Sequence, residues 1–511
     1  MEPAHQRGFL RARIVAVLAA LLLCSFALPS SAFSLLGPYA NWMQPTNNFR
    51  MPGDIGGPMD ITEAYRWNVP VLTYGFDRSF LDFFGDQGVA AVESAIQILN
   101  DLPPASATVL TNYPFSSAHY NWTAEAAYLI DLKTAALCAL VEHMGLAQPQ
   151  RHMFVLRQWH PWLPSGTDQS LWPPGTIPTY ITERNFAPES LNPSRYVNQA
   201  LFYGEYIHEN GIAFVLAYAD PFATFAPPVA EGFFEFNPFG SFFTNLTYDD
   251  VGGIRFLLCA TNVNYETLLP DIQPANPNRP LVNGAWRPGV EKITFVSHDY
   301  DKKSGEPLPM TFRYKDTYLT NGGLMHQNVK RVVTRPDFLF SAGDIGPVLY
   351  LPPYARSGTT NWLNNASLNG QPGAAGPGII TPPVQIVFHK LGPQFITQPP
   401  EWGSTQVYPM NWGSFDTSTN APSIYPVGTG AAGTNLTVWF RIYGGTRGNA
   451  VQLSSHTWSE PALPGGLVQL QTSTNLLNWT TEAVATNNGT VIDWLHVGAQ
   501  LPRQFFRSVA Q

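Results

Sequence analysis

Residues 131–152, DLKTAALCALVEHMGLAQPQRH, decide the fold that the sequence predicts for the first half of the chain. Apolar side chains recur here at helical spacing, so the pattern predicts a helix from about Thr123 to Met144. Its buried face would comprise Leu129, Leu132, Ala136, Leu140 and Met144. Gly145 follows, and glycine is the residue that most often ends a helix in the left-handed conformation. A buried helix and a sharp turn are therefore expected.

The segment before this helix predicts a strand followed by another helix. Arg66 and Trp67 precede VPVLTYGF, in which Tyr74 and Phe76 share one alternating face. Asp86 suits the N-cap of a helix. The apolar positions of that helix are Val89, Val92, Ile96 and Leu99. A second strand is expected in SATVLTNY, residues 106–113.

A later segment, LTYDDVGGIRFLL, predicts one more helix. Thr247 and Asp250 have the spacing of a capping box, in which each side chain accepts a hydrogen bond from the other residue's backbone N–H. Between the helices, YVNQALFYGEYI and GIAFVLAYAD predict a hairpin around Glu209 and Gly211. His208 and Glu209 would then lie at the hairpin tip, without a second His at metal-binding spacing.

The helix at 131–152 resembles the active-site helix of matrixin-type metzincins, whose pattern is H-E-x-x-H-x-x-G-x-x-H. Aligned on Gly145-Leu146, Cys138 and Glu142 occupy the two helical His positions. Ala139 occupies the position of the catalytic Glu, and Gln148 that of the third His. The entry strand with its helix, and the Asp249-Asp250 helix, also resemble parts of such domains. The resemblance implies an α+β metzincin-like domain whose zinc motif is not intact.

Thiolate, carboxylate and imidazole can all bind zinc, so Cys138, Glu142 and His152 are the candidate metal ligands. Glu142 is also the only candidate catalytic carboxylate of this helix. The alternative places Cys138 in the core, with Glu142 and His143 facing solvent near the helix end. Because Ala139 cannot act as a general base, the structural alternative is favoured and no cofactor is expected.

Three further features have both a functional and a structural interpretation. Cys138 and Cys259 form a candidate disulfide or remain two thiols. Asp299, Asp301 and Glu306 suggest calcium, although solvated turn carboxylates are more common. Loop tryptophans could contact a ligand or pack an insertion onto the domain; they are Trp159, Trp162 and Trp172.

The remainder of the chain predicts mainly β structure, as sandwich-like domains. The expected divisions are a metzincin-like domain at 33–262 with an irregular insertion at about 153–242, a β-rich part at 263–355, a linker at 356–383 and a C-terminal β domain at 384–511. Segment 467–511, with LVQLQTSTNLLNW and a final FFR, is similar to small C-terminal modules of exported proteins from Verrucomicrobia-type bacteria.

Residues 1–32 predict a cleavable export signal. Arg7, Arg11 and Arg13 precede a short apolar run, and Ser30-Ser31-Ala32 forms a small-x-small cleavage site, so the mature chain would start near Phe33. No later segment is apolar and long enough to predict a membrane span. The net charge of −8 without a basic cluster argues against nucleic acid as a partner.

Two functional hypotheses follow. The first is a secreted or cell-surface protein without catalytic activity, whose scaffold and β domains bind an extracellular protein or glycan. The second is a secreted hydrolase, either a metallopeptidase with non-standard ligands or a glycan-active enzyme.

Overall fold

The computed structural model describes residues 31–51, 53–63, 65–158, 180–209, 212–224, 226–232, 239–301, 305–345, 356–364, 378–396 and 404–426. It also describes short C-terminal segments at 440–441, 456–458, 467–473, 479–486, 492–494 and 505–510. The fold is mixed α/β, with more strands than helices and with both parallel and antiparallel sheets.

A seven-stranded sheet forms the centre of the molecule, in the order β18-β4-β21-β23-β22, with β24 and β3 also paired to β23. Neighbours along β18-β4-β21-β23 are parallel, whereas β22 and β24 run antiparallel to β23. The strands are β3 (Tyr65–Arg66), β4 (Val71–Phe76), β18 (Thr294–Ser297), β21 (Phe338–Ile345), β22 (Arg356–Asn364), β23 (Gly378–Ile396) and β24 (Ser404–Pro409).

This sheet combines segments that the sequence assigned to different domains. The expected border after residue 262 separates β4 from β18 and β21, which pair with it directly. The segment 356–383, expected to be a linker, instead supplies β22 and the beginning of β23. Its Gly, Pro and Asn content suggested a loop, but sheet pairing with residues far along the chain overrides that local preference.

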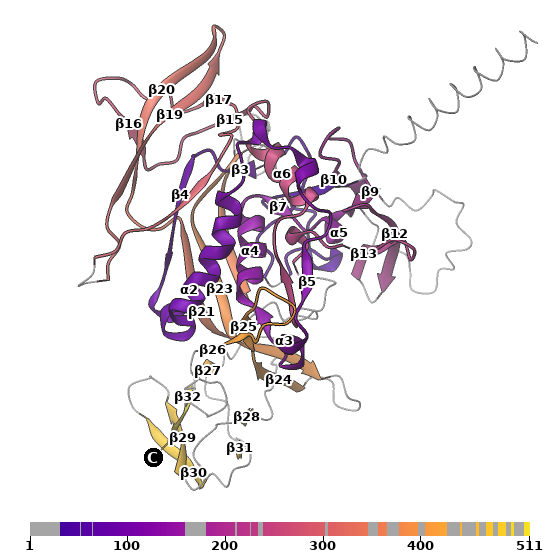
Figure 1. Cartoon of the computed structure of the whole chain (residues 1–511), viewed down its shortest axis with the longest axis vertical. Helices are drawn as coiled ribbons and strands as arrows, with labels where there is room; N and C mark the ends of the chain where they lie inside the picture. The colour runs from indigo at the N-terminus through magenta and orange to yellow at the C-terminus, as the bar shows by residue number, and fades with distance from the viewer. Residues whose placement is uncertain are drawn as a thin grey trace, which may run out of the picture.

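Two long helices pack side by side against the central sheet, α2 (Arg78–Asn100) and α4 (Leu132–His143) (Figure 1). Helix α2 begins earlier than expected, because the Asp77 side chain accepts from the backbone N–H of Phe80 and caps it. Gly85 has a φ of 58° and kinks the helix one residue before Asp86, where the sequence predicted its start.

The expected helix from Thr123 to Met144 is two helices. The short α3 (Trp122–Ala126) is capped by Asn121, and Tyr128 then has a φ of 52° that breaks the helix. After β6 (Ile130–Asp131), Asp131 caps α4. The expected strand at 106–113 is wrong as well, since this segment forms the 3-10 turns η2 (Ala105–Ala107) and η3 (Leu110–Asn112).

The capping box of Thr247 and Asp250 is present and begins α6 (Tyr248–Leu258). The predicted hairpin is also present, with β12 (Ala200–Glu209) paired antiparallel to β13 (Ile212–Ala219). Helix α6 packs on β1 (Phe33–Gly37), a strand that pairs with β2 (Gly57–Met59), β7 (Leu146–Ala147) and β10 (Asn185–Phe186).

The remaining elements surround this body. A five-stranded antiparallel sheet contains the long β19–β20 hairpin, which projects from the molecule (Figure 1). Its strands are β15 (Asn264–Glu266), β16 (Ile272–Pro274), β17 (Ala285–Arg287), β19 (Met310–Thr320) and β20 (Gly323–Val333). The shorter strands pair as β5 with β14, β8 with β9, β11 with β12, and β25 with both β26 and β6. Their bounds are β5 (Ala118–Tyr120), β8 (Phe154–Gln158), β9 (Tyr180–Glu183), β11 (Tyr196–Val197), β14 (Ser241–Phe243), β25 (Trp412–Ser414) and β26 (Ser423–Tyr425).

The described C-terminal strands pair with one another in two small sheets, β27-β32-β29-β30 and β28-β31. They are β27 (Phe440–Arg441), β28 (His456–Trp458), β29 (Leu467–Ser473), β30 (Thr480–Thr486), β31 (Ile492–Trp494) and β32 (Phe505–Ala510).

Candidate functional site

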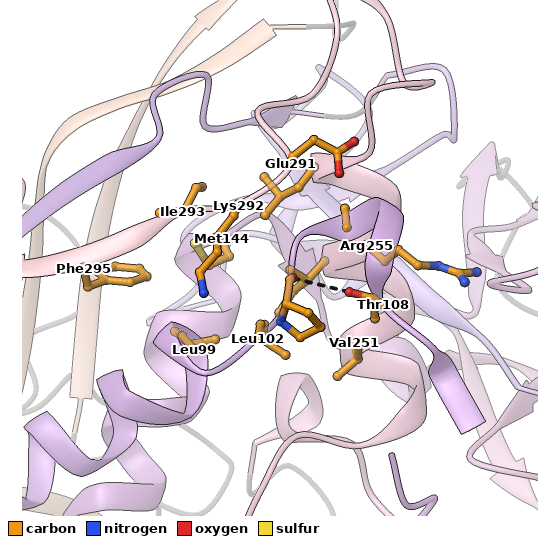
Figure 2. A pocket seen from close by; sticks show the side chains of 14 residues that line it. Leu99, Leu102, Thr108, Met144, Val251, Arg255, Glu291, Lys292, Ile293 and Phe295 are labelled. Carbon is orange, nitrogen blue, oxygen red and sulfur yellow. Dashed lines mark hydrogen bonds between the residues drawn. The ribbon is translucent and has the colours of Figure 1, made fainter. Parts of the chain in front are cut away.

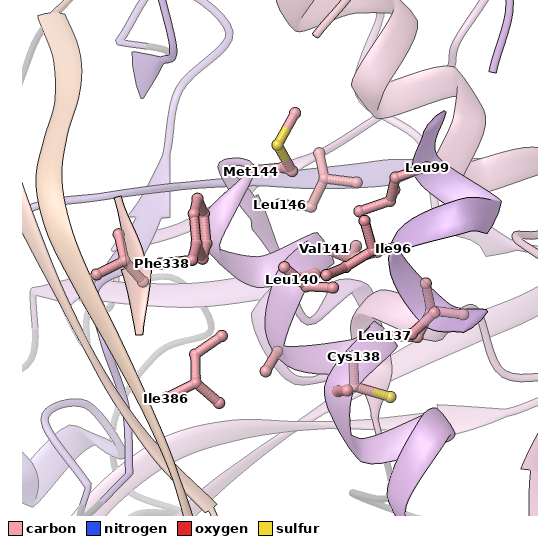
Figure 3. Packing of buried hydrophobic residues seen from close by; sticks show 14 of the residues in the cluster. Ile96, Leu99, Leu137, Cys138, Leu140, Val141, Met144, Leu146, Phe338 and Ile386 are labelled. Carbon is pink, nitrogen blue, oxygen red and sulfur yellow. The ribbon is translucent and has the colours of Figure 1, made fainter. Parts of the chain in front are cut away.

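Helix α4 is buried on every side. All residues from Thr134 to His143 lie in the interior, and an α-helix that is apolar around its whole circumference belongs in a core. Figure 3 shows Leu137 and Val141 directed toward Ile96 and Leu99 of α2, and Leu140 near Phe338 and Ile386 of the central sheet. Cys138 is among these apolar side chains and is 0% exposed, as the structural alternative expected.

The end of α4 is also buried, which corrects the expectation that Glu142 and His143 face solvent. Glu142 is 8% exposed and His143 is 0% exposed. The reason is β22, whose backbone crosses the His143 ring at Gly358. A Cβ on Gly358 would lie 2.4 Å from Cε1 of His143, so the strand can approach this closely only with glycine at that position. The ring Nδ1 lies 2.7 Å from the Ala139 carbonyl oxygen.

Gly145 turns the chain back on itself after α4. Its φ is 111°, and a Cβ would lie 2.7 Å from the Tyr65 carbonyl oxygen, so both backbone conformation and space require glycine. The turn brings Gln148 next to the end of α4, where its Nε2 donates to Oε1 of Glu142 over 3.4 Å. Glu142 and Gln148 therefore meet in space.

Arg151 forms hydrogen bonds with polar groups near the end of α4. The Arg151 guanidinium donates to both oxygens of Asp54, at 2.5 and 2.7 Å, and to the Asn48 carbonyl oxygen at 2.9 Å. Its Nη1 also lies 3.4 Å from Oε1 of Gln148. The ion pair is almost closed to solvent, with side-chain exposures of 6% and 12%. We call Asp54, Glu142, Gln148 and Arg151 the Arg151 cluster.

Two neighbours complete the surroundings of this cluster. Glu231, 1% exposed, accepts from the backbone N–H of Gln150 at 2.7 Å. Burial and then the Asp54 carboxylate raise the pKa of Tyr39, so its hydroxyl stays protonated at neutral pH. The Arg151 cluster is therefore a buried polar network, in which a guanidinium supplies the positive charge.

His152 faces a different set of partners. Its ring stacks on Phe49, with centroids 6.1 Å apart and planes at 13°. Burial, and secondarily the charge of Arg151, hold the pKa of His152 well below its usual value, so the ring is neutral. Within the described part of the chain, no three His, Cys, Asp or Glu side chains are grouped so that they could hold a metal. Cys138, Glu142 and His152 are thus not brought together as one ligand set.

Where the structure describes the other candidate residues, they make local contacts within the fold. Cys138 and Cys259 are not joined by a disulfide, and Sγ of Cys259 lies 3.1 Å from the Thr261 hydroxyl at the end of α6. In the candidate calcium loop, the backbone N–H of Asp301 donates to the Glu306 carbonyl oxygen, closing a turn. Trp159, Trp162 and Trp172 lie outside the described residues, and so do the side chains of His208 and Glu209.

The described residues line two hollows. A crevice of about 20 Å³, enough for roughly one water, lies between α2 and α6 and is lined by Leu99, Met144 and Val251 (Figure 2). An open hollow of about 550 Å³ lies between β15 and the β22–β23 hairpin. At its wall, the Glu266 carboxylate is paired with Arg66 at 2.8 Å, both side chains being at most 1% exposed.

Arg151 and Asp54 were not singled out from the sequence. The same holds for the buried Arg331–Asp337 and Arg287–Asp316 ion pairs. Nothing local indicated which arginine meets which carboxylate.

No family model, curated protein or solved structure matches the chain. Among the described residues, no helix has the length and apolar character needed to cross a bilayer.

Proposed function

We propose that this protein is an exported, non-catalytic binding or display protein, built on a metzincin-like scaffold in which the zinc site has become a structural polar cluster. The observation that carries the proposal is the Arg151 cluster. Its guanidinium contacts Gln148, which in turn donates to Glu142, and these two residues align with positions where the motif of an active metzincin has zinc ligands.

Electrostatics supports this interpretation. A guanidinium is permanently charged and would repel a divalent cation held by the neighbouring groups, most strongly where water is excluded. Both oxygens of Asp54 accept hydrogen bonds from Arg151, so this carboxylate is already engaged with the guanidinium. At the position of the general base, Ala139 has no group that could take a proton from a water molecule.

The binding role is assigned to the β structure outside the central sheet. The projecting β19–β20 hairpin and the C-terminal strands offer surface away from α4, and the resemblance of segment 467–511 to exported bacterial modules supports a place outside the cell. We expect an extracellular protein or glycan as the partner.

Metal analysis of the purified mature protein tests the proposal. After incubation with equimolar zinc and desalting, we expect far less than one zinc per chain. One zinc per chain that is lost in Cys138→Ala and Glu142→Ala would overturn the proposal in favour of a secreted metallopeptidase. Cys259→Ala is the matched control, since this thiol lies at the end of α6 and belongs to no candidate ligand set.

A further inference from the structure

Two adjacent carboxylates are buried at the beginning of α6. Asp249 and Asp250 are 0% and 1% exposed. The Asp250 carboxylate accepts four hydrogen bonds at 2.7 to 2.9 Å, from the N–H and hydroxyl of Thr247 and from the N–H groups of Val229 and Ala230. These contacts complete the capping box and fix the 229–231 turn.

Asp249 differs in that two of its donors belong to the predicted export signal. It accepts from the Asn198 N–H at 2.7 Å, from the Ser31 hydroxyl and from the backbone N–H of Ala32. Among the described residues, no Lys, Arg or His side chain forms an ion pair with either carboxylate of this pair. Burying a carboxylate without a cation is costly, and here a second carboxylate is adjacent. The described side chains therefore supply no formal positive charge to this pair.

The beginning of the described chain runs along α6 from this position. Ser31 contacts Asp249, and Phe33 stacks on Phe256 with ring centroids 5.7 Å apart. A Cβ on Gly253 would lie 3.1 Å from Cβ of Phe33. Asp249 and Gly253 are one turn apart on the same helix face, so Phe33 begins close to the Asp249 carboxylate.

We propose that Asp249 binds the α-ammonium group of Phe33, which is created when the export signal is cleaved after Ala32. The proposal rests on the predicted export signal and not on whether the protein binds zinc. Hydrolysis of the Ala32–Phe33 bond consumes one water; the new carboxylate leaves with residues 1–32, and the amine of Phe33 takes up a proton. Release of Ser31 and Ala32 removes a hydroxyl and an N–H donor from Asp249, and a charge-assisted hydrogen bond from the ammonium replaces these two neutral contacts.

The burial of the cleavage site determines the order of cleavage and folding. Ser31, Ala32 and Phe33 are at most 1% exposed, so cleavage has to precede the docking of β1. Processing then ties β1 to α6, and a chain that keeps residues 1–32 lacks the ion pair. The Asp249 site thereby distinguishes the processed from the unprocessed protein.

A double-mutant cycle tests the proposal. Asp249→Asn is compared in two backgrounds, the chain that starts at Phe33 and a chain that keeps Ser31-Ala32 behind an added Gly. In the first background we expect a loss of at least about 5 °C in Tm, and in the second less than half of that loss. Asp250→Asn is the matched control, because its partners are internal and its effect should be equal in both backgrounds. Equal effects of Asp249→Asn in the two backgrounds would overturn the proposal.

A second measurement does not depend on the variants folding. The mature wild-type protein is treated with an amine-reactive reagent at neutral pH, and labelling of the N-terminal peptide is followed by mass spectrometry. We expect labelling at least tenfold slower than in the urea-unfolded chain. Labelling at the unfolded rate, or an exported protein that begins away from Phe33, contradicts the proposal.

Discussion

Asp131 shows at the residue scale how one buried carboxylate joins distant segments. It caps α4 by accepting from the Thr134 N–H at 2.8 Å, and it also accepts from the N–H of Phe415 at 3.3 Å. Burial raises its pKa to about 6. The residue therefore holds a proton in the folded protein under conditions where the unfolded chain has released it.

We predict that Asp131 makes the protein less stable as pH rises from about 4 to about 6, because over this window the folded state binds more protons than the unfolded state. Asp131→Asn keeps a capping oxygen and removes the titration. The change in the free energy of unfolding between pH 4 and pH 7 should differ from that of the wild type by up to about 3 kcal/mol. Urea unfolding at both pH values measures it, with Asp77→Asn at the cap of α2 as the control. An unchanged pH dependence in Asp131→Asn would show that this carboxyl titrates normally.

Gly145 is the second residue on which the site depends. Gly145→Ala combines a φ of 111° with a contact of 2.7 Å to the Tyr65 carbonyl oxygen, so we expect a loss of roughly 3 kcal/mol or more in unfolding free energy. Gly323→Ala is the matched control, because its φ is 107° but nothing lies within 4 Å; it should cost about 1 kcal/mol. Similar losses in the two variants would mean that the close approach to Tyr65 does not matter.

At the scale of elements, the sequence predicted what is encoded locally. The capping box of Thr247 and Asp250 and the β12–β13 hairpin follow from residues a few positions apart, and both are present. It did not predict β22, because that strand depends on pairing with β23 and on closing over His143. The resemblance aligned Glu142 and Gln148 with two positions of one motif, but it predicted neither their hydrogen bond nor the contact of Asp54 with Arg151.

The crossing of β22 over α4 gives a prediction for a pair of residues. Gly358→Ala forces a methyl group against the His143 ring, and we expect a loss of roughly 1–3 kcal/mol in unfolding free energy. In a chain that already carries His143→Ala the clash is gone, so the added cost of Gly358→Ala should fall by at least about 1 kcal/mol. Denaturant unfolding of the four chains measures this coupling, and strictly additive losses would contradict the described packing.

The whole molecule has a core assembled from both halves of the chain. Strand β4 pairs with β18 and β21, and β23 brings in residues beyond 378, whereas the described strands from 440 onward pair only with one another. The domain borders expected from composition missed this arrangement, because composition shows where segments change character and not which segments pair.

Truncated chains test whether residues 33–262 fold as a separate domain or only together with the later strands of the central sheet. We predict that a chain of residues 33–426 unfolds in one cooperative thermal transition with a near-UV circular dichroism signal, and that residues 33–262 do neither, since they keep only β3 and β4 and lack the other five strands of the central sheet. A cooperative transition in the shorter fragment would restore the border after residue 262.

Val71 in β4 pairs with Thr294 in β18, so β4 cannot complete its pairing until β18 has been synthesised. At the usual rate of translation, roughly 10 to 40 s pass between the emergence of β4 and that of its partner β18. During this interval β4 has unpaired backbone groups and apolar side chains without a sheet to cover them. Until β18 is made, the newly made chain therefore exposes apolar surface and an unpaired strand edge on which it can aggregate.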